Sequence, residues 1–195
     1  MSPGLSFAEK PTLTGEHVVL RPVCAADAYK LAATDDETDR LTGTHRTFTL
    51  DELERWYVSR AEHDDRLDLA IVERASGQLA GELALMDLDV DNRSCAFRIA
   101  LVGAGSYGRG LGTEASRLVL AHAFDTVGLH RVDLEVYAFN PRARHVYEKL
   151  GFVYEGTKRQ ALYWDGEWVD ARIMSILSSD WAQHQSPAAV ANSDR

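Results

Sequence analysis

The stretch from Tyr107 to Ala115 has the residue types and spacing of an anion-binding turn. Glycines at positions 103, 105, 108, 110 and 112 lead through it, and glycine lets the backbone take positive φ and approach a ligand closely. A helix that begins directly after such a turn presents unpaired N–H groups at the positive end of its dipole, which favours a phosphate or pyrophosphate. Arg109 can add a cation there. A tight strand-to-helix turn without a ligand explains the same glycines equally well.

Three phosphate-binding patterns compete for these glycines. The P-loop pattern fails because the glycines at 105 and 110 are followed by Leu and Gly in place of Lys and Ser or Thr. The dinucleotide pattern G-x-G-x-x-G is met at 103, 105 and 108, which keeps a dinucleotide-dependent oxidoreductase as an alternative. However, helical periodicity begins late for that pattern, and no second βαβ half follows. The third pattern, x-G-x-G-x-G/A running straight into a helix, fits residues 107–112.

A second stretch, Asn140–Phe152, has the pattern of a helix with good capping residues at both ends and a tyrosine that packs near its C-terminus. Asn140 is a good N-cap, Pro141 stands at the first helical position and Gly151 at C′. Phe152 would then pack on Tyr147 in a Schellman ending. Seven residues separate Asn140 from Tyr147, about two turns, so both can face the end of the preceding strand. A capped helix with a packed tyrosine is the non-catalytic explanation.

Together the two stretches resemble the GCN5-related N-acetyltransferases, the GNAT superfamily. Residues 107–115 resemble its acetyl-CoA loop, with Tyr107 in place of the usual Gln or Arg. Residues 140–152 resemble its segment N-x-x-A/S-x-x-x-Y-x-x-x-G-F at every fixed position. The ending Asp165–Leu177 is similar to the RimJ/RimL-type branch, which acetylates N-terminal amines of ribosomal proteins and also includes enzymes for polyamines and amine-bearing antibiotics. The resemblance spans roughly residues 16–181.

What the resemblance implies is direct transfer of an acetyl group from acetyl-CoA to a primary amine in a ternary complex. It implies that Asn140 binds the pantetheine arm and that Tyr147 stands beside the sulfur, where it is the candidate acid for the leaving thiolate. A non-catalytic sensor of acetyl-CoA is the alternative from another class. The expected cofactor-binding residues are Ala100, Leu101, Val102, Tyr107, Gly108, Arg109, Gly110, Leu111, Gly112, Thr113, Asn140, Arg144 and Tyr147.

The base that takes a proton from the ammonium is less clearly marked. Glu82 alternates with Ala80, Ala84 and Met86 on one face of a predicted strand, and a carboxylate in such surroundings would have a raised pKa and could serve as the base. Glu135 on a later strand is the rival, and a chain of waters is a third option. A solvated strand carboxylate is the non-catalytic explanation of Glu82.

The elements that must position these residues indicate an α/β (α+β) chain with the GNAT fold. We expect a mixed, mostly antiparallel sheet of about seven strands with helices on both faces. Residues 1–15 are expected to be irregular, 16–181 to form a single acetyltransferase domain, and 182–195 to be a disordered tail. Helices are predicted at Ala25–Thr34 and, after a capping box at Thr49, at Leu50–Glu62. The loop Leu41–Phe48 between them is where we expect substrate selection.

The composition of the chain limits the classes of partner that we expect. The chain has 195 residues, a net charge of −9 and two cysteines. The acidic balance argues against nucleic acid and suits an amine-bearing acceptor, such as a protein N-terminus, a polyamine or an antibiotic-like amine. No stretch is apolar enough to span a membrane, and neither a membrane partner nor a metal is expected. The cysteine usage favours the cytoplasm. The resemblance and two tryptophans near an antiparallel edge suggest a homodimer.

Overall fold

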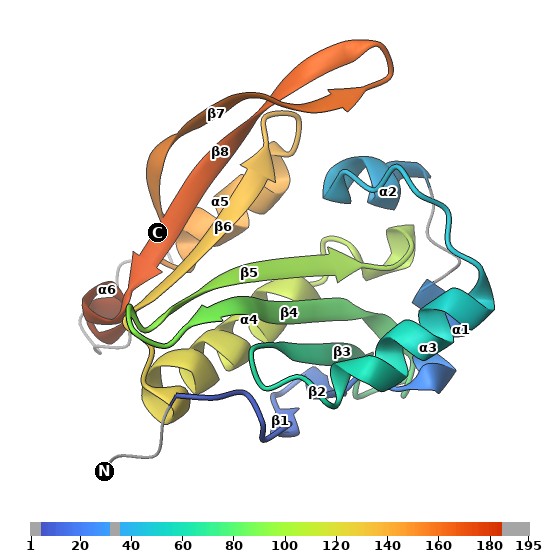
Figure 1. Cartoon of the computed structure of the whole chain (residues 1–195), viewed down its shortest axis with the longest axis horizontal. Helices are drawn as coiled ribbons and strands as arrows, with labels where there is room; N and C mark the ends of the chain where they lie inside the picture. The colour runs from blue at the N-terminus through green and yellow to red at the C-terminus, as the bar shows by residue number, and fades with distance from the viewer. Residues whose placement is uncertain (1–4, 32–35, 185–195) are drawn as a thin grey trace.

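Eight strands form one sheet in the computed structural model of the chain, which describes residues 5–31 and 36–184. The order across the sheet is β1-β2-β3-β4-β5-β6-β8-β7 (Figure 1). The strands are β1 (Leu13–Thr14), β2 (Val18–Pro22), β3 (Leu67–Glu73), β4 (Leu79–Asp89), β5 (Ser94–Leu101), β6 (Arg131–Tyr137), β7 (Val153–Trp164) and β8 (Glu167–Leu177).

All neighbouring strands in this sheet are antiparallel except β5 and β6, which are parallel. Their ladder holds three residue pairs, Ser94 with Arg131, Cys95 with Val132, and Ala96 with Asp133. Beyond these pairs the two strands diverge (Figure 1). We call this region, residues 97–101 of β5 and 134–137 of β6, the fork. The edge of β5 that faces the fork has no strand partner in the described part of the chain.

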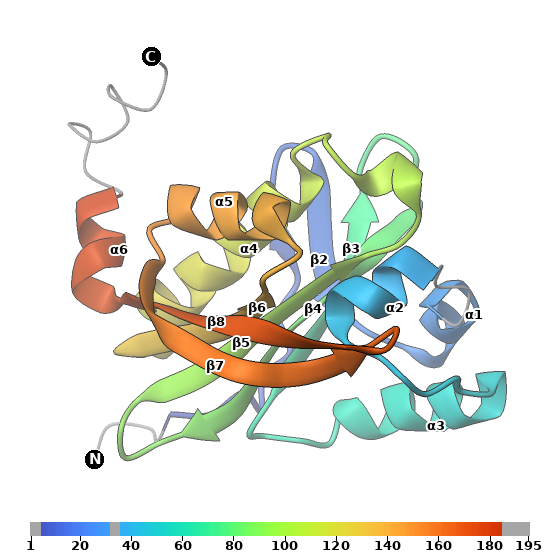
Figure 2. The same ribbon diagram turned by 90° about the horizontal axis from the view of Figure 1, so that it is seen from above.

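Helices cover both faces of the sheet, as expected (Figure 2). On one face lie α4, which a π-helical turn continues at His122–Val127, and α5; α1, α2 and α3 lie on the other face, and α6 follows β8. The helices are α1 (Ala28–Leu31), α2 (Asp36–Thr42), α3 (Leu50–Arg60), α4 (Leu111–Ala121), α5 (Pro141–Lys149) and α6 (Ser178–His184), with short 3-10 turns at Ala25–Asp27 and Ala104–Ser106. No described helix is both long and apolar enough to cross a membrane.

Strand alternation separates two apolar clusters. The larger one takes the face covered by α4 and α5, where Leu83 of β4, Phe97 of β5 and Val132 of β6 are buried. The smaller cluster lies under α3 and contains Tyr57 and Ala70. Neighbouring residues of β5 therefore face different environments, and this alternation decides which side chains reach each side of the fork.

The structure departs from the sequence-based expectation in three places. The sheet has eight strands in place of about seven, because Leu13–Thr14 pairs with β2 inside a segment expected to be irregular. Helix α2 was not expected, and it takes in the first two residues of the expected loop Leu41–Phe48. The helix expected at Ala25–Thr34 starts as a 3-10 turn, and its last residues, 32–34, lie outside the described residues. Residues 185–195 of the expected tail also lie outside the described residues, whereas residues 182–184 of that tail belong to α6, which ends at His184.

Candidate active site

The fork opens into a cavity of about 600 Å³, the fork cavity. Its walls include Phe97 and Ile99 from the α4 side of β5, and also Arg98 and Ala100 from the α3 side. Because successive strand residues point to opposite faces, a cavity lined by both sets passes through the sheet. A ligand in the fork can thus be reached from both faces.

At one end of the fork cavity the glycine turn leads into α4. Gly110 is the N-cap of α4 with φ 79°, a left-handed conformation that favours glycine. The N–H groups of Leu111, Gly112 and Thr113 have no acceptor among the described residues, so an anion bound there would meet free donors and the positive helix end. Gly112 serves another need, since a Cβ there would lie 3.3 Å from Leu101 Cδ1. Its small size lets α4 approach β5.

Two arginines expected at this site do not line the fork cavity in the described structure. The Arg109 guanidinium forms an ion pair with Glu73 at the end of β3. Arg144 donates from Nε to Glu148 one turn along α5, at 2.7 Å. Arg109 lies in the glycine turn and Arg144 in α5, and the charges of both are directed to carboxylates of the protein.

Arg142 lines the fork cavity and was not singled out from the sequence. It is the second residue of α5, and its guanidinium carbon lies 4.2 Å from the centre of the Tyr107 ring. The Tyr107 hydroxyl lies 3.2 Å from Thr38 Oγ1 in α2 and donates to the Leu101 carbonyl at 3.3 Å. An arginine in the first turn after an N-cap was the only sequence signal for Arg142, and it does not predict stacking on Tyr107.

The helix predicted after Asn140 is confirmed in detail. Asn140 Oδ1 accepts a hydrogen bond from Ala143 N at 3.0 Å, which leaves Nδ2 without an acceptor among the described residues. At the other end Gly151 has φ 96°, and Phe152 N donates to the Tyr147 carbonyl at 3.0 Å, as in a Schellman ending. Asn140 and Tyr147 both line the fork cavity.

Tyr147 is 8% exposed, with its ring 5.7 Å from that of Phe152 and 6.3 Å from that of Phe97. Its hydroxyl has no hydrogen-bond partner among the described residues, so it is available to a ligand in the fork cavity. Burial raises the pKa of Tyr147 to about 12. The group is therefore a protonated donor at neutral pH.

A second cavity of about 760 Å³, the α3 cavity, lies between α2, α3 and the strands β4 and β5. Glu82 of β4 lines it, and Tyr57 of α3 donates a hydrogen bond to Glu82 Oε2 at 2.8 Å. Burial raises the pKa of Glu82, although the charge of Arg98 and the hydrogen bond from Tyr57 oppose this. Its rival Glu135 lines the fork cavity in an ion pair with Lys158 at 2.6 Å.

The two cavities share Thr38, Thr42, Arg98 and Ala100 in their walls. Of the strand residues expected at the cofactor, Ala100 lines both, Leu101 only the fork cavity and Val102 only the α3 cavity. Two molecules, one in each cavity, would meet at Ala100. The arrangement suits a reaction between two bound substrates.

Helix α2 and the loop after it bridge the two sides of the fork. A Cβ at Gly43 would lie 2.5 Å from the Tyr137 hydroxyl at the end of β6. The His45 ring centroid lies 5.0 Å from that of Trp164 at the tip of the β7–β8 hairpin. The loop expected to select the substrate therefore borders the α3 cavity, and it is held in place by the C-terminal strands.

Comparison with known proteins agrees with this geometry. The profile of the family described as "Acetyltransferase (GNAT) domain" matches residues 17–153. Spermidine N(1)-acetyltransferase from Vibrio cholerae is 32% identical over 133 residues, which cover 68% of this chain and 76% of that protein. A putative ribosomal N-acetyltransferase from Bacillus subtilis, YdaF, is 27% identical over 182 residues, 85% of this chain and 94% of that protein.

Among solved structures, a GCN5-related N-acetyltransferase from Brucella melitensis superposes with a TM-score of 0.75 and 26% identity, over 93% of this chain and 85% of that chain.

The dinucleotide-dependent alternative is wrong, because such a fold needs parallel strands on both sides of its crevice and this sheet has one parallel pair. The N-acetyltransferase relatives also favour an enzyme over a cofactor sensor. The chain belongs to the GNAT family and is an acyl-CoA-dependent N-acyltransferase.

Proposed function

We propose that this enzyme transfers the acetyl group of acetyl-CoA directly to a primary amine, with the cofactor in the fork cavity and the amine in the α3 cavity. The observation that carries the proposal is that the two cavities meet at Ala100, on the edge of β5 that pairs with no other strand of the described chain. Holding both reactants at one point supplies much of the rate, and no covalent enzyme intermediate is needed.

Three parts of acetyl-CoA, the pyrophosphate, the pantetheine arm and the thioester, each have a binding group in the fork. Its pyrophosphate takes the free N–H groups of residues 108–113, with Arg142 as the nearby cation. Its pantetheine amides pair with the free edge of β5 at 100–102, as an added strand would. The Asn140 amide Nδ2 donates to the same arm. A backbone N–H of β5 then holds the thioester carbonyl oxygen, where negative charge develops.

The acid and the base stand on opposite sides of the fork. On the α3 side Glu82, held by Tyr57, takes a proton from the acceptor ammonium. The neutral nitrogen attacks the thioester carbon, the N–C bond forms and the C–S bond breaks, and the nitrogen releases its second proton to water. On the α4 side Tyr147 serves as the acid, and the hydrogen bond from its hydroxyl stabilises the negative charge that develops on the departing sulfur. The Glu135–Lys158 ion pair favours Glu82 over Glu135 as the base.

The acceptor is proposed from the relatives and the branch resemblance together. One relative is named for spermidine and another as a putative ribosomal N-acetyltransferase, which supports an amine on a small molecule or a protein N-terminus. We also retain a homodimer as part of this proposal. Strand β7 is an edge strand and Trp168 is 60% exposed, whereas Trp164 packs on His45 within the chain.

The test is an acetyl-CoA titration followed by an amine screen with detection of free thiol. We expect acetyl-CoA to raise the melting temperature and at least one amine to release CoA. An unchanged melting temperature at millimolar acetyl-CoA would contradict the cofactor site. Transfer to alcohols alone, with every amine inactive, would contradict the proposed acceptor chemistry.

A further inference from the structure

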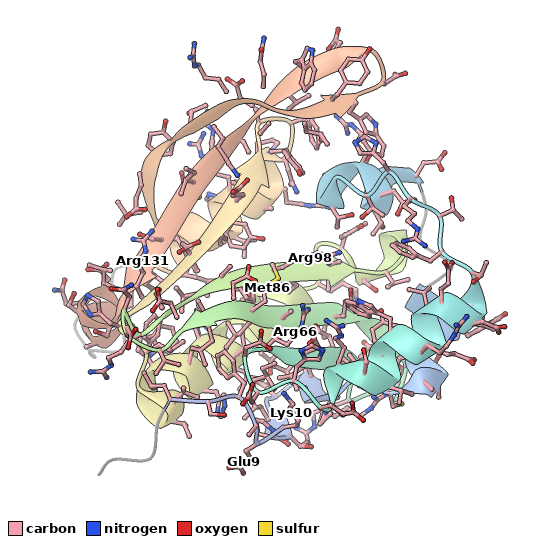
Figure 3. The ribbon with its side chains drawn as sticks, viewed as in Figure 1. Glu9, Lys10, Arg66, Met86, Arg98 and Arg131 are labelled. Atoms are coloured by element: carbon pink, nitrogen blue, oxygen red, sulfur yellow. The ribbon has the colours of Figure 1, made fainter. Side chains whose placement is uncertain are left out.

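Arg98, at the centre of the site, is a cation that forms no ion pair or hydrogen bond with the described residues. It lies on β5, where the strand borders the fork (Figure 3). Its side chain is exposed and lines both the fork cavity and the α3 cavity. No hydrogen bond or ion pair joins it to any described residue. The proposed acetyl transfer gives it no role.

Sheet register places Arg98 close to Glu82 on the same face. Glu82 is paired with Ala100, and Ala84 is paired with Arg98. Arg98 is therefore the diagonal neighbour of Glu82, at a Cα separation of about 7–8 Å. The Arg98 charge acts on Glu82 and opposes the rise in its pKa, but the two side chains are not in contact as an ion pair. A small molecule that carries both a cation and an anion can bridge this spacing.

The other arginines of the α3 cavity already have partners among the described residues. Arg46 forms an ion pair with Glu52 at 2.6 Å. Arg55 donates from Nε to the Asp51 carbonyl at 3.0 Å. When both substrates fill the site they displace water from Arg98, and a guanidinium that loses its water without gaining an anion costs free energy.

Resting on the proposed function, we infer that the acceptor is a small amino acid-like molecule, a primary amine with a carboxylate close to it. Arg98 binds the carboxylate, for which the planar guanidinium offers two parallel N–H donors. Glu82 receives the ammonium. A polyamine would instead bring a second ammonium near Arg98, and like charges repel in a partly desolvated site.

The experiment compares acceptors that differ at one end only. The first set is 4-aminobutanoate, butylamine and 1,4-diaminobutane, and the second is a panel of α-amino acids with their amides. Each is assayed for kcat/KM at saturating acetyl-CoA. We expect the wild type to favour at least one carboxylate over its neutral partner by about ten-fold or more, as a charge-assisted hydrogen bond provides.

Variants then test whether Arg98 is the cause. Arg98→Gln should bring the carboxylate-to-neutral ratio close to one, and Arg98→Lys should retain part of it. Arg117→Gln is the matched control, because Arg117 is an exposed arginine of α4 that lines neither cavity. It should keep the wild-type ratio.

Three results would overturn the inference while leaving the amine transfer itself intact. The first is a wild-type preference for 1,4-diaminobutane over every free amino acid. The second is a carboxylate preference that survives in Arg98→Gln, and the third is an Arg98→Gln defect confined to the KM of acetyl-CoA. Absence of transfer to any amine would instead refute the proposed function and this inference with it.

Discussion

Replacing Tyr147 with Phe tests the proposed proton donor with little structural disturbance. The change keeps the ring contacts with Phe97 and Phe152, and the helix ending at Gly151 depends on backbone groups. The hydroxyl that is lost has no partner among the described residues. We therefore expect the free energy of unfolding to change by no more than about 0.5 kcal/mol.

The effect on catalysis follows from the pKa of the donor. Burial raises the pKa of Tyr147 to about 12, whereas a thiol has a reference pKa of about 8.5. Complete proton transfer to a solvated thiolate would then be uphill by about 3.5 pKa units, so stabilisation of the developing thiolate by the hydrogen bond dominates. A hydrogen bond to a charged group contributes about 1.5–3 kcal/mol. We expect kcat to fall about 10- to 100-fold, which reaches only the lower bound of about 100-fold for general acid catalysis.

The assay is single-turnover thiol release at saturating acetyl-CoA and acceptor, with acetyl-CoA affinity measured by calorimetry. Affinity should stay near normal, because only the donor to the leaving sulfur is removed. Tyr29→Phe is the control, since Tyr29 is 76% exposed and lines neither cavity. A wild-type single-turnover rate in Tyr147→Phe would refute the reasoning, and the thiolate would then take its proton from water or from the attacking amine.

Three further predictions concern the base and the glycine turn. Tyr57→Phe removes a hydrogen bond that lowers the pKa of Glu82, so the acidic limb of the kcat/KM profile against pH should move to higher pH. If that limb stays at the same pH, Glu82 is not the titrating base. Glu82→Gln should abolish most activity yet stabilise the fold at neutral pH. Burial raises the folded-state pKa of Glu82, so the wild type loses stability as the pH rises above the unfolded-state pKa of about 4.3. The difference in melting temperature between variant and wild type should therefore grow above that pH and vanish near pH 4. Gly110→Val should weaken acetyl-CoA binding at least ten-fold by straining the N-cap at positive φ. The control Gly166→Val, at φ 83° in the β7–β8 turn, should lower the melting temperature without changing the affinity for acetyl-CoA. Equal affinities in both variants would show that the phosphates bind elsewhere.

Features that depend on near neighbours in sequence were predictable. The N-cap at Asn140, the Schellman ending at Gly151 and the capping box between Thr49 and Glu52 are all present. Each of them is formed by residues within a few positions of one another, so residue type and spacing were sufficient. The ion pair of Arg144 with Glu148 belongs to the same class, and it explains why that arginine is turned from the cavity.

Features that depend on the fold were not predictable in the same way. The partner of Arg109 is Glu73, which is 36 positions away. Helix α2 carries a single large apolar residue, Leu41, so it has no helical periodicity, and its acidic first turn was the only signal. Arg98 alternates on a strand like any solvent-facing residue, and only the register of β4 and β5 places it beside Glu82.

The three residue pairs between β5 and β6 also make the substrate site a seam in the molecule. On either side of the seam the strands are held by longer antiparallel ladders, β2 to β5 on one side and β6, β8 and β7 on the other. We expect amide protons along the open edge of β5 to exchange without the two halves having to unfold. In the proposed complex the pantetheine arm pairs with this edge and closes the seam, and at 100 times its dissociation constant the ligand would contribute about 2.7 kcal/mol to the stability of the folded state. The supply of acyl donor would then set how firmly the two halves of the sheet hold together, as well as how fast the enzyme turns over.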